Sequence, residues 1–231
     1  MGASDFSKLP HIGESVRRKE DYRFLTGAGQ YTDDIVLAAQ SFAVFVRSPH
    51  AHARVVSINS DAAKAAPGVI GVFTGADVAA DNINGLPCGW LITSTNGEPM
   101  KEPPHPILAQ GKVRYVGDGV AMVVAETLQQ ARDAAERVEV DYDVLPAVVN
   151  VQDAAAGAVA GAGLHDIAED NHCFKWAIGD KGAVESVFAN AAHVTKLDLV
   201  NNRLIPNAME PRAAIGSYNR GTDEYTLYVS N

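Results

Sequence analysis

A string bracketed by prolines near the end of the chain carries the residue best suited to chemistry. In Met209-Glu-Pro-Arg212, the carboxylate of Glu210 lies between Pro206 and Pro211. A carboxylate held in a stiff loop can act as a general base. It can equally hold the loop in place, through a fixed ion pair with Arg212 at a domain junction. Anchoring of the loop is the favoured interpretation, so no catalytic residue is expected in this chain, and Glu210 is kept as the one candidate for catalysis.

Other residue types used in catalysis or metal binding are present, but their spacing does not build a site. His50 and His52 lie two residues apart, and two imidazoles without a third ligand favour packing over metal binding. Ser48 has no acid nearby that would orient a histidine base. Cys88 and Cys173 lack metal-ligand spacing and are expected to be free thiols. We therefore predict no metal-binding residue and no cofactor-binding residue in this chain.

Two further short patterns have structural rather than chemical interpretations. Asp33 and Asp34 are adjacent, so in an extended segment their side chains point to opposite faces and cannot share a proton. A turn or helix-capping role is expected for them. The pair Gly27 and Gly29 is not followed by a strand-turn-helix pattern, so it does not predict a dinucleotide site.

The elements around these residues follow an order of strand, helix and strand that occurs twice. The first set comprises strands over residues 41–47, 53–58 and 69–73, with a helix over 61–66. The second set comprises strands over residues 113–116, 120–125 and 138–144, with a helix over 127–138. Thr127 and Gln130 have the spacing of a capping box at the start of that second helix. Together these patterns predict a mixed α/β domain.

The rest of the chain divides into an arm, an irregular stretch, a linker and a second unit. Residues 1–30 are a polar arm, residues 31–151 the α/β domain, and residues 152–165 a linker of small residues. Within the domain, residues 77–111 hold five prolines and no sustained periodicity, so a mobile irregular stretch is expected.

The second unit covers residues 166–231 and is predicted to be α+β. Its expected elements are a helix over 182–192 and strands over 193–200, 213–218 and 225–229. The turn at residues 219–222 joins the last two strands as a hairpin. A unit that closes on a strand is expected to be incomplete, and its apolar residues to lack part of their cover.

Composition excludes several classes of function. The net charge of −9 repels a phosphate backbone, so nucleic-acid binding is not expected. No apolar run reaches the roughly 18 residues needed to span a membrane. The first residues lack a basic region followed by an apolar region, so they do not resemble a signal peptide. The cytoplasm is the expected location.

Beyond these patterns, several stretches resemble one enzyme family in the same order along the chain. Residues 16–34 (VRRKEDYRFLTGAGQYTDD) resemble the opening of large subunits in the carbon monoxide dehydrogenase branch of the xanthine oxidase family. Further stretches that are similar to those subunits cover residues 45–58, 67–77, 113–126 and 131–149. The resemblance implies that these stretches form the family's hammerhead domain. Residues 202–218 (NRLIPNAMEPRAAIGSY) resemble the start of its molybdopterin-binding domain.

The resemblance also implies an activity, cofactors and partners. Members of the family hydroxylate a carbon centre or oxidise carbon monoxide at a molybdenum held by molybdopterin. Iron–sulfur and FAD subunits complete their complexes. By this resemblance, the glutamine near the metal, the glycine-rich cofactor loop and the late catalytic glutamate would lie beyond Asn231. No cofactor is therefore expected on this chain alone.

Two functions follow as expectations. The first is a fragment or split piece of the large subunit of a molybdenum hydroxylase, which supplies scaffold and subunit contacts to an oxidoreductase complex. The alternative is a non-catalytic scaffold that retains the hammerhead fold. Both predict association, either with the remainder of the molybdopterin subunit or as an oligomer.

Overall fold

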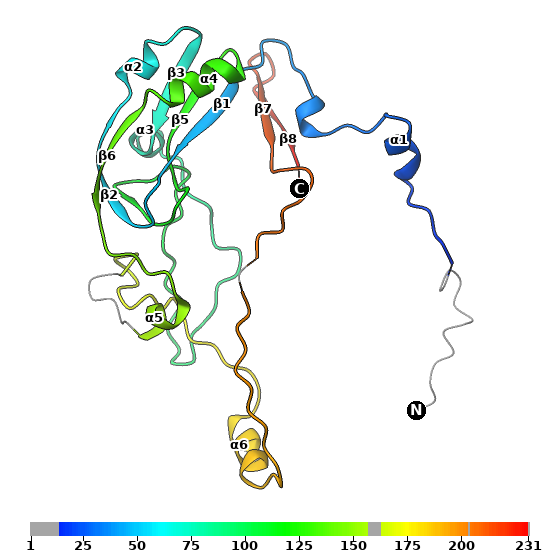
Figure 1. Ribbon diagram of the computed structural model, residues 1–231, viewed down its shortest axis with the longest axis vertical. Helices are drawn as coiled ribbons and strands as arrows, with labels where there is room; N and C mark the ends of the chain where they lie inside the picture. The colour runs from blue at the N-terminus through cyan, green and yellow to red at the C-terminus, as the bar shows by residue number, and fades with distance from the viewer. Residues whose placement is uncertain (1–13, 157–162, 203, 231) are drawn as a thin grey trace. The chain divides into compact units, whose positions relative to one another are not determined.

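The computed structural model describes residues 14–156, 163–202 and 204–230 (Figure 1). The chain forms two compact units. One runs from Ala39 to Lys196; the other joins the described residues up to Ala38 with those from Leu197 onward. This division differs from the domain limits expected from the sequence, which therefore stay a prediction. No helix in the described ranges is long and apolar enough to cross a membrane.

The larger unit is built on two three-stranded sheets. The first has the order β1 (Phe42–Arg47), β5 (Gly119–Ala125), β3 (Val69–Thr74), with antiparallel pairing on both sides of β5. The second has the order β4 (Lys112–Val113), β2 (Ala53–Asn59), β6 (Glu139–Val144). All six predicted strands of the α/β domain are present, and the mixed helix and strand fold is confirmed.

One of these strands is shorter than expected. The sequence predicts a strand over residues 113–116, but β4 ends at Val113. The carboxylate of Asp118 accepts a hydrogen bond from the backbone N–H of Arg114 at 3.0 Å, and Gly117 has a φ of 91°. This turn removes residues 114–118 from the ladder, because a left-handed residue cannot continue a strand.

Helix α4 (Leu128–Ala135) covers one face of the first sheet. It begins at the predicted capping pair, where the Thr127 hydroxyl accepts a hydrogen bond from the Gln130 N–H at 3.2 Å. Its small residue Ala134 is fully buried against Val72 and Val123, in a core that α2 (Asp61–Lys64) also enters through Ala63. Alanine on the contact face lets the helix lie close to the sheet.

The irregular stretch begins with a helix that the sequence analysis did not predict. Helix α3 (Gly75–Ala80) is capped by Asp77, whose Oδ2 accepts hydrogen bonds from the Thr74 N–H and hydroxyl, both at 2.7 Å. Further on, the N–H groups of Thr95 and Lys101 donate to the carbonyls of Lys175 and Cys173, each at 2.9 Å. The stretch is irregular as expected, but it has defined partners, and its mobility stays a prediction.

The linker and the end of the larger unit differ from expectation in two places. Helix α5 (Val151–Ala156) occupies the start of the predicted linker, while residues 157–162 lie outside the described part. Helix α6 (Lys181–Ala189) is present, capped by Asp180. The prediction of a strand over residues 193–200 is wrong: that segment pairs with no strand in the described residues, and extended backbone becomes a strand only when a neighbour completes its ladder.

The smaller unit contains the predicted hairpin. Strands β7 (Ala214–Asn219) and β8 (Glu224–Val229) pair in antiparallel register, and the rings of Tyr218 and Tyr225 stack at 4.6 Å. The unit also contains α1 (Asp21–Leu25), which lies in the segment predicted as an arm, and the short helix η2 (Thr32–Asp34), which follows that segment. Residues 1–13 of that predicted arm lie outside the described part.

Candidate functional site

Glu210, the candidate catalytic residue, has a structural partner in the smaller unit. Its Oε1 accepts a hydrogen bond from the backbone N–H of Thr32 at 3.0 Å. Thr32 is the first residue of η2, and it is 6% exposed. No ion pair joins Glu210 to Arg212 among the described residues. The geometry therefore supports the anchoring interpretation, although through a backbone amide rather than the expected guanidinium.

The neighbouring acidic pair also has a capping role, as predicted. Asp34 Oδ2 accepts a hydrogen bond from the Tyr31 N–H at 2.8 Å, which closes the first turn of η2. Glu210 and Asp34 thus satisfy backbone donors at the same short helix. A carboxylate committed to a backbone donor is less available to take a proton from a substrate.

The histidines singled out in the sequence pack rather than react. His52 is 3% exposed, and its Nδ1 lies 2.8 Å from the carbonyl oxygen of Pro146. His50 packs edge-on against the ring of Tyr142, with 5.0 Å between the ring centroids. Ser48 accepts a hydrogen bond from the N–H of His50 at 3.0 Å, so its hydroxyl closes a turn. These contacts agree with the interpretation of both histidines as surface or packing residues.

The part of the chain that the structure describes contains no cluster of metal ligands and no disulfide. No group of three or more His, Cys, Asp or Glu side chains lies close enough there to hold a metal ion. Cys88 and Cys173 are both free, as the sequence analysis predicted.

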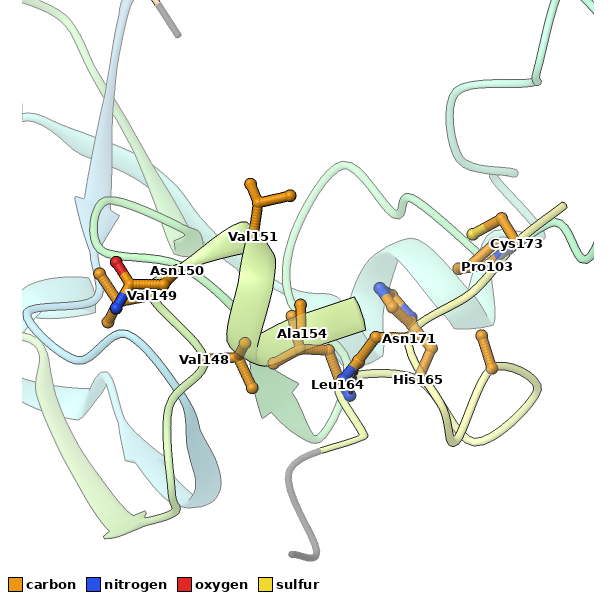
Figure 2. A pocket seen from close by; sticks show the side chains of 11 residues that line it. Pro103, Val148, Val149, Asn150, Val151, Ala154, Leu164, His165, Asn171 and Cys173 are labelled. Carbon is orange, nitrogen blue, oxygen red and sulfur yellow. Dashed lines mark hydrogen bonds between the residues drawn. The ribbon is translucent and has the colours of Figure 1, made fainter. Parts of the chain in front are cut away.

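A different histidine, His165, which the sequence analysis did not single out, lines two cavities of the larger unit. The first cavity has a volume of about 270 Å³, and its lining is mostly apolar (Figure 2). Val148 and α5 contribute to one part of it, and the loop from Leu164 to Cys173 to another. The second cavity has a volume of about 220 Å³ and is lined by Lys112, Arg114 and Asp118 among others. His165 and Pro103 line both.

The surroundings of His165 disfavour its charged form. Its Nδ1 is buried and has no hydrogen-bond partner. Burial first, and then the positive charge of Arg114, lower the pKa of His165 below its ordinary value of 6.5, and Asp166 opposes this shift. Two cationic side chains contact the residues on either side of His165: Lys112 Nζ lies 3.1 Å from Asp166 Oδ1, and Arg114 Nε donates to the Leu164 carbonyl at 2.8 Å. No pattern in the sequence indicated this residue, because its burial depends on segments far apart along the chain.

Two family models match the chain. The model described as "Aldehyde oxidase and xanthine dehydrogenase, a/b hammerhead domain" matches residues 26–146. The model of the molybdopterin cofactor-binding domain matches residues 164–231. The two matches cover the regions in which the sequence analysis placed the hammerhead domain and the start of the molybdopterin-binding domain.

Curated relatives extend the match over nearly the whole chain. The carbon monoxide dehydrogenase large chain of Afipia carboxidovorans is 36% identical over 236 residues, which cover 96% of this chain and 27% of that protein. The nicotine 6-hydroxylase large subunit of Paenarthrobacter nicotinovorans is 34% identical over 219 residues, or 95% of this chain and 26% of that one. The chain therefore spans about a quarter of the length of these relatives.

Solved structures give the same result. The reconstituted carbon monoxide dehydrogenase from Oligotropha carboxidovorans matches with a TM-score of 0.80 and 35% identity, covering 96% of this chain and 28% of that one. Quinoline 2-oxidoreductase from Pseudomonas putida 86 matches with a TM-score of 0.73 and 34% identity, covering 94% of this chain and 26% of that one.

The second family match supports molybdopterin as the cofactor of the complete enzyme. Such a group needs a cavity whose hydrogen-bond donors face its polar edges. The matched region contributes the segment 164–173 to the first cavity, whose lining is mostly apolar, and its strands β7 and β8 form an exposed hairpin. The described residues of the matched region do not by themselves fit the group, so no chemical step is assigned to them.

Sequence, fold and comparisons agree on one assignment. The resemblance stated from the sequence is confirmed by both family models and by relatives that align over nearly the whole chain. The chain belongs to the aldehyde oxidase and xanthine dehydrogenase family, and it corresponds to the N-terminal part of the family's molybdopterin-binding large subunit.

Proposed function

We propose that this chain supplies scaffold and subunit contacts within the large subunit of a molybdenum hydroxylase. The complete enzyme would be an oxidoreductase that hydroxylates a carbon centre or oxidises carbon monoxide, with molybdopterin as its cofactor. The partners would be the rest of the molybdopterin subunit together with iron–sulfur and FAD subunits. The cytoplasm remains the proposed location, and two free cysteines suit a reducing compartment.

One observation carries this proposal: the first sheet has an uncovered apolar row of two phenylalanines and one methionine on one of its faces. Phe45 on β1 and Phe73 on β3 both pair with Met122 on β5, so the three side chains lie side by side across the sheet. The next residue, Val123, faces α4, and adjacent strand residues point to opposite faces. The row therefore lies on the face away from α4. Phe45 is 40% exposed and Phe73 is 41% exposed.

The hairpin of the smaller unit presents a second uncovered apolar face. The paired residues Tyr218 and Tyr225 share a face with Leu227, and all three are exposed. Isolated two-stranded hairpins are only marginally stable in water, so a covering partner would stabilise this one. Large apolar side chains that lie together on the surface often mark an interaction site, because soluble proteins bury most such side chains.

The contact role can be tested by oxidative footprinting, because methionine and phenylalanine side chains react with hydroxyl radicals in proportion to their exposure. Oxidation of Phe45, Met122 and Phe73 is compared between the 231-residue chain alone and the chain assembled with its partner subunits. We expect oxidation of the row to fall several-fold on assembly. Equal oxidation in the two samples would show that this face is not a contact.

A matched pair of variants adds a functional measure. Replacing Phe45 and Phe73 with Ser should prevent assembly, because it removes both aromatic anchors of the row. The control is Val56→Ser on β2, an exposed apolar residue of the other sheet. Loss of assembly in the control alone, or in neither variant, would contradict the proposed contact.

The alternative is a non-catalytic scaffold with the same fold. It predicts an assembly that forms normally but contains no molybdenum. Metal analysis of the purified complex separates the two functions: molybdenum supports the enzyme, and a stable complex without it supports the scaffold.

A further inference from the structure

Residues 164–175, called here the clasp segment, are held against the larger unit by contacts to two distant stretches. From the region around β4, Arg114 Nε donates to the Leu164 carbonyl at 2.8 Å, and Lys112 pairs with Asp166 at 3.1 Å. From the irregular stretch, the Lys101 N–H donates to the Cys173 carbonyl, and its ammonium lies 3.2 Å from Asp170. The clasp segment therefore contacts both the irregular stretch and the region around β4.

His165 lies within the clasp segment, close to several charged groups. It forms a β-bridge with Ala168, which is 3% exposed, and it lines both cavities. Its Nδ1 is buried without a partner. Charged and titratable groups face it from the elements packed around it: Arg114, Lys112, His105 and Asp166, with Tyr115 and Asp118 in the lining of the second cavity and Cys173 in the lining of the first.

We propose that the clasp segment is a pH-sensitive latch, closed while His165 is neutral and opened when His165 takes up a second proton. A neutral imidazole can leave one buried nitrogen without a donor to satisfy. A protonated ring carries N–H donors on both nitrogens and a charge that needs a partner. At this position the Nδ1–H would find no acceptor, and the charge would lie close to the Arg114 guanidinium.

The direction of the effect follows from proton binding. Burial and Arg114 lower the pKa of His165 in the closed form, whereas an opened segment exposes the ring to water and restores the ordinary value of 6.5. Between those two values the open form binds more protons. The closed form is therefore fully favoured above pH 6.5 and loses stability as the pH falls through the lowered pKa. The latch is a property of one compact unit and does not depend on the proposed function.

Hydrogen exchange on the 231-residue chain tests the latch. The probes are the amides of Thr95 and Lys101, which donate to carbonyls of the clasp segment. After correction for the intrinsic pH dependence of exchange, we expect constant protection above pH 6.5. Below it, protection should fall by up to about tenfold for each pH unit within the titration window. Amides of β5 serve as the internal reference and should stay protected.

Variants decide whether His165 is the trigger. His165→Phe and His165→Gln both remove the titrating ring, and the probe amides should lose their pH dependence in both. His105→Gln and His172→Gln remove the neighbouring histidines and should leave the pH dependence in place. Loss of the pH dependence in either neighbour variant, or its survival in both His165 variants, would overturn the proposal.

A second measurement covers the case in which the His165 variants do not fold. Titration of the histidine ring resonances in the unaltered chain gives the protonation midpoint of His165. We expect that midpoint to lie below 6.5, and we expect the loss of protection at Thr95 and Lys101 to begin near pH 6.5 and to level off near the midpoint. Protection that goes on falling at pH values well below the midpoint, or protection that does not depend on pH, would show that the latch does not exist.

Discussion

Glu210 and Thr32 are separated by 178 positions in the sequence, yet the carboxylate of the first accepts a hydrogen bond from the backbone N–H of the second at 3.0 Å. The bond ties the segment that precedes the hammerhead strands to the segment that leads into β7. Because Thr32 is 6% exposed, water has limited access to replace the carboxylate. This geometry supports an anchoring role for Glu210 in the smaller unit.

Removing this acceptor should loosen the smaller unit. Glu210→Ala leaves a buried N–H without a partner, at a cost of about 1–3 kcal/mol, whereas Glu210→Gln retains a side-chain oxygen that can accept. We expect hydrogen exchange at the Thr32 amide to rise strongly in the alanine variant and only slightly in the glutamine variant. Arg212→Gln is the control and should leave this amide unchanged.

The same variants address catalysis in an assembled enzyme. If Glu210 were a base, Glu210→Gln would abolish turnover while the Thr32 amide kept its protection. An anchoring role predicts that turnover falls only in those Glu210 variants in which the Thr32 amide loses its protection against exchange.

The cap of α3 should contribute to stability in a pH-dependent way. The Thr74 hydroxyl donates to Asp77 and lowers the pKa of that carboxyl below its ordinary value of 3.8. The contribution is therefore present above pH 3.8 and is lost as the pH falls through the lowered pKa. Thr74→Ala should cost about 0.5–2 kcal/mol at pH 7 and progressively less in acid.

Urea unfolding of the chain at several pH values measures this difference. Asp81→Asn, at the other end of α3, is the control and should show no comparable loss. An equal loss for Thr74→Ala at pH 7 and in strong acid would contradict the assigned cap.

Limited proteolysis should begin within the irregular stretch. Hydrogen bonds hold it at residues 86, 95 and 101, but Trp90 and Leu91 between these points are exposed. We expect chymotrypsin to cut at these residues before any cut occurs within β5, where backbone groups are paired on both sides. A first cut within β5 would show that the stretch is as rigid as the sheet.

The chain by itself should bind no molybdopterin. The described residues of the matched domain line a mostly apolar cavity through the segment 164–173 and then form an exposed hairpin, and neither offers a set of donors suited to the cofactor. Metal analysis of the purified chain, after expression in cells that make the cofactor, should find no stoichiometric molybdenum. One molybdenum per chain would refute the expectation.

The chain should also associate in solution. Four of the apolar residues expected to lack cover are exposed in the structure, namely Leu197, Leu199, Leu227 and Val229, while Ile215 is half-buried. Replacing Tyr225 and Leu227 with Ser should shift the chain toward a monomer in light scattering. The two substitutions remove apolar side chains from one face of β8, so that burying this face in a contact would contribute less free energy. A chain that is already a monodisperse monomer would contradict this prediction.

Features encoded by neighbouring residues could be predicted from the sequence alone. The strands of the two sheets, the capping pair at Thr127 and the turn of the β7–β8 hairpin all depend on residues a few positions apart. Alternation and capping express local preferences that hold before the chain folds. The family could also be identified, because the residues that carry the resemblance follow the same order along the chain.

Contacts between distant segments depended on the tertiary structure. The row of Phe45, Met122 and Phe73 exists because β5 lies between β1 and β3, an order that strand patterns do not specify. The same limit explains the missing strand at residues 193–200, since an extended segment becomes a strand only when a partner lies beside it. The burial of His165 and the bond from Thr32 to Glu210 likewise required the fold, because each depends on which distant groups the packed chain places nearby.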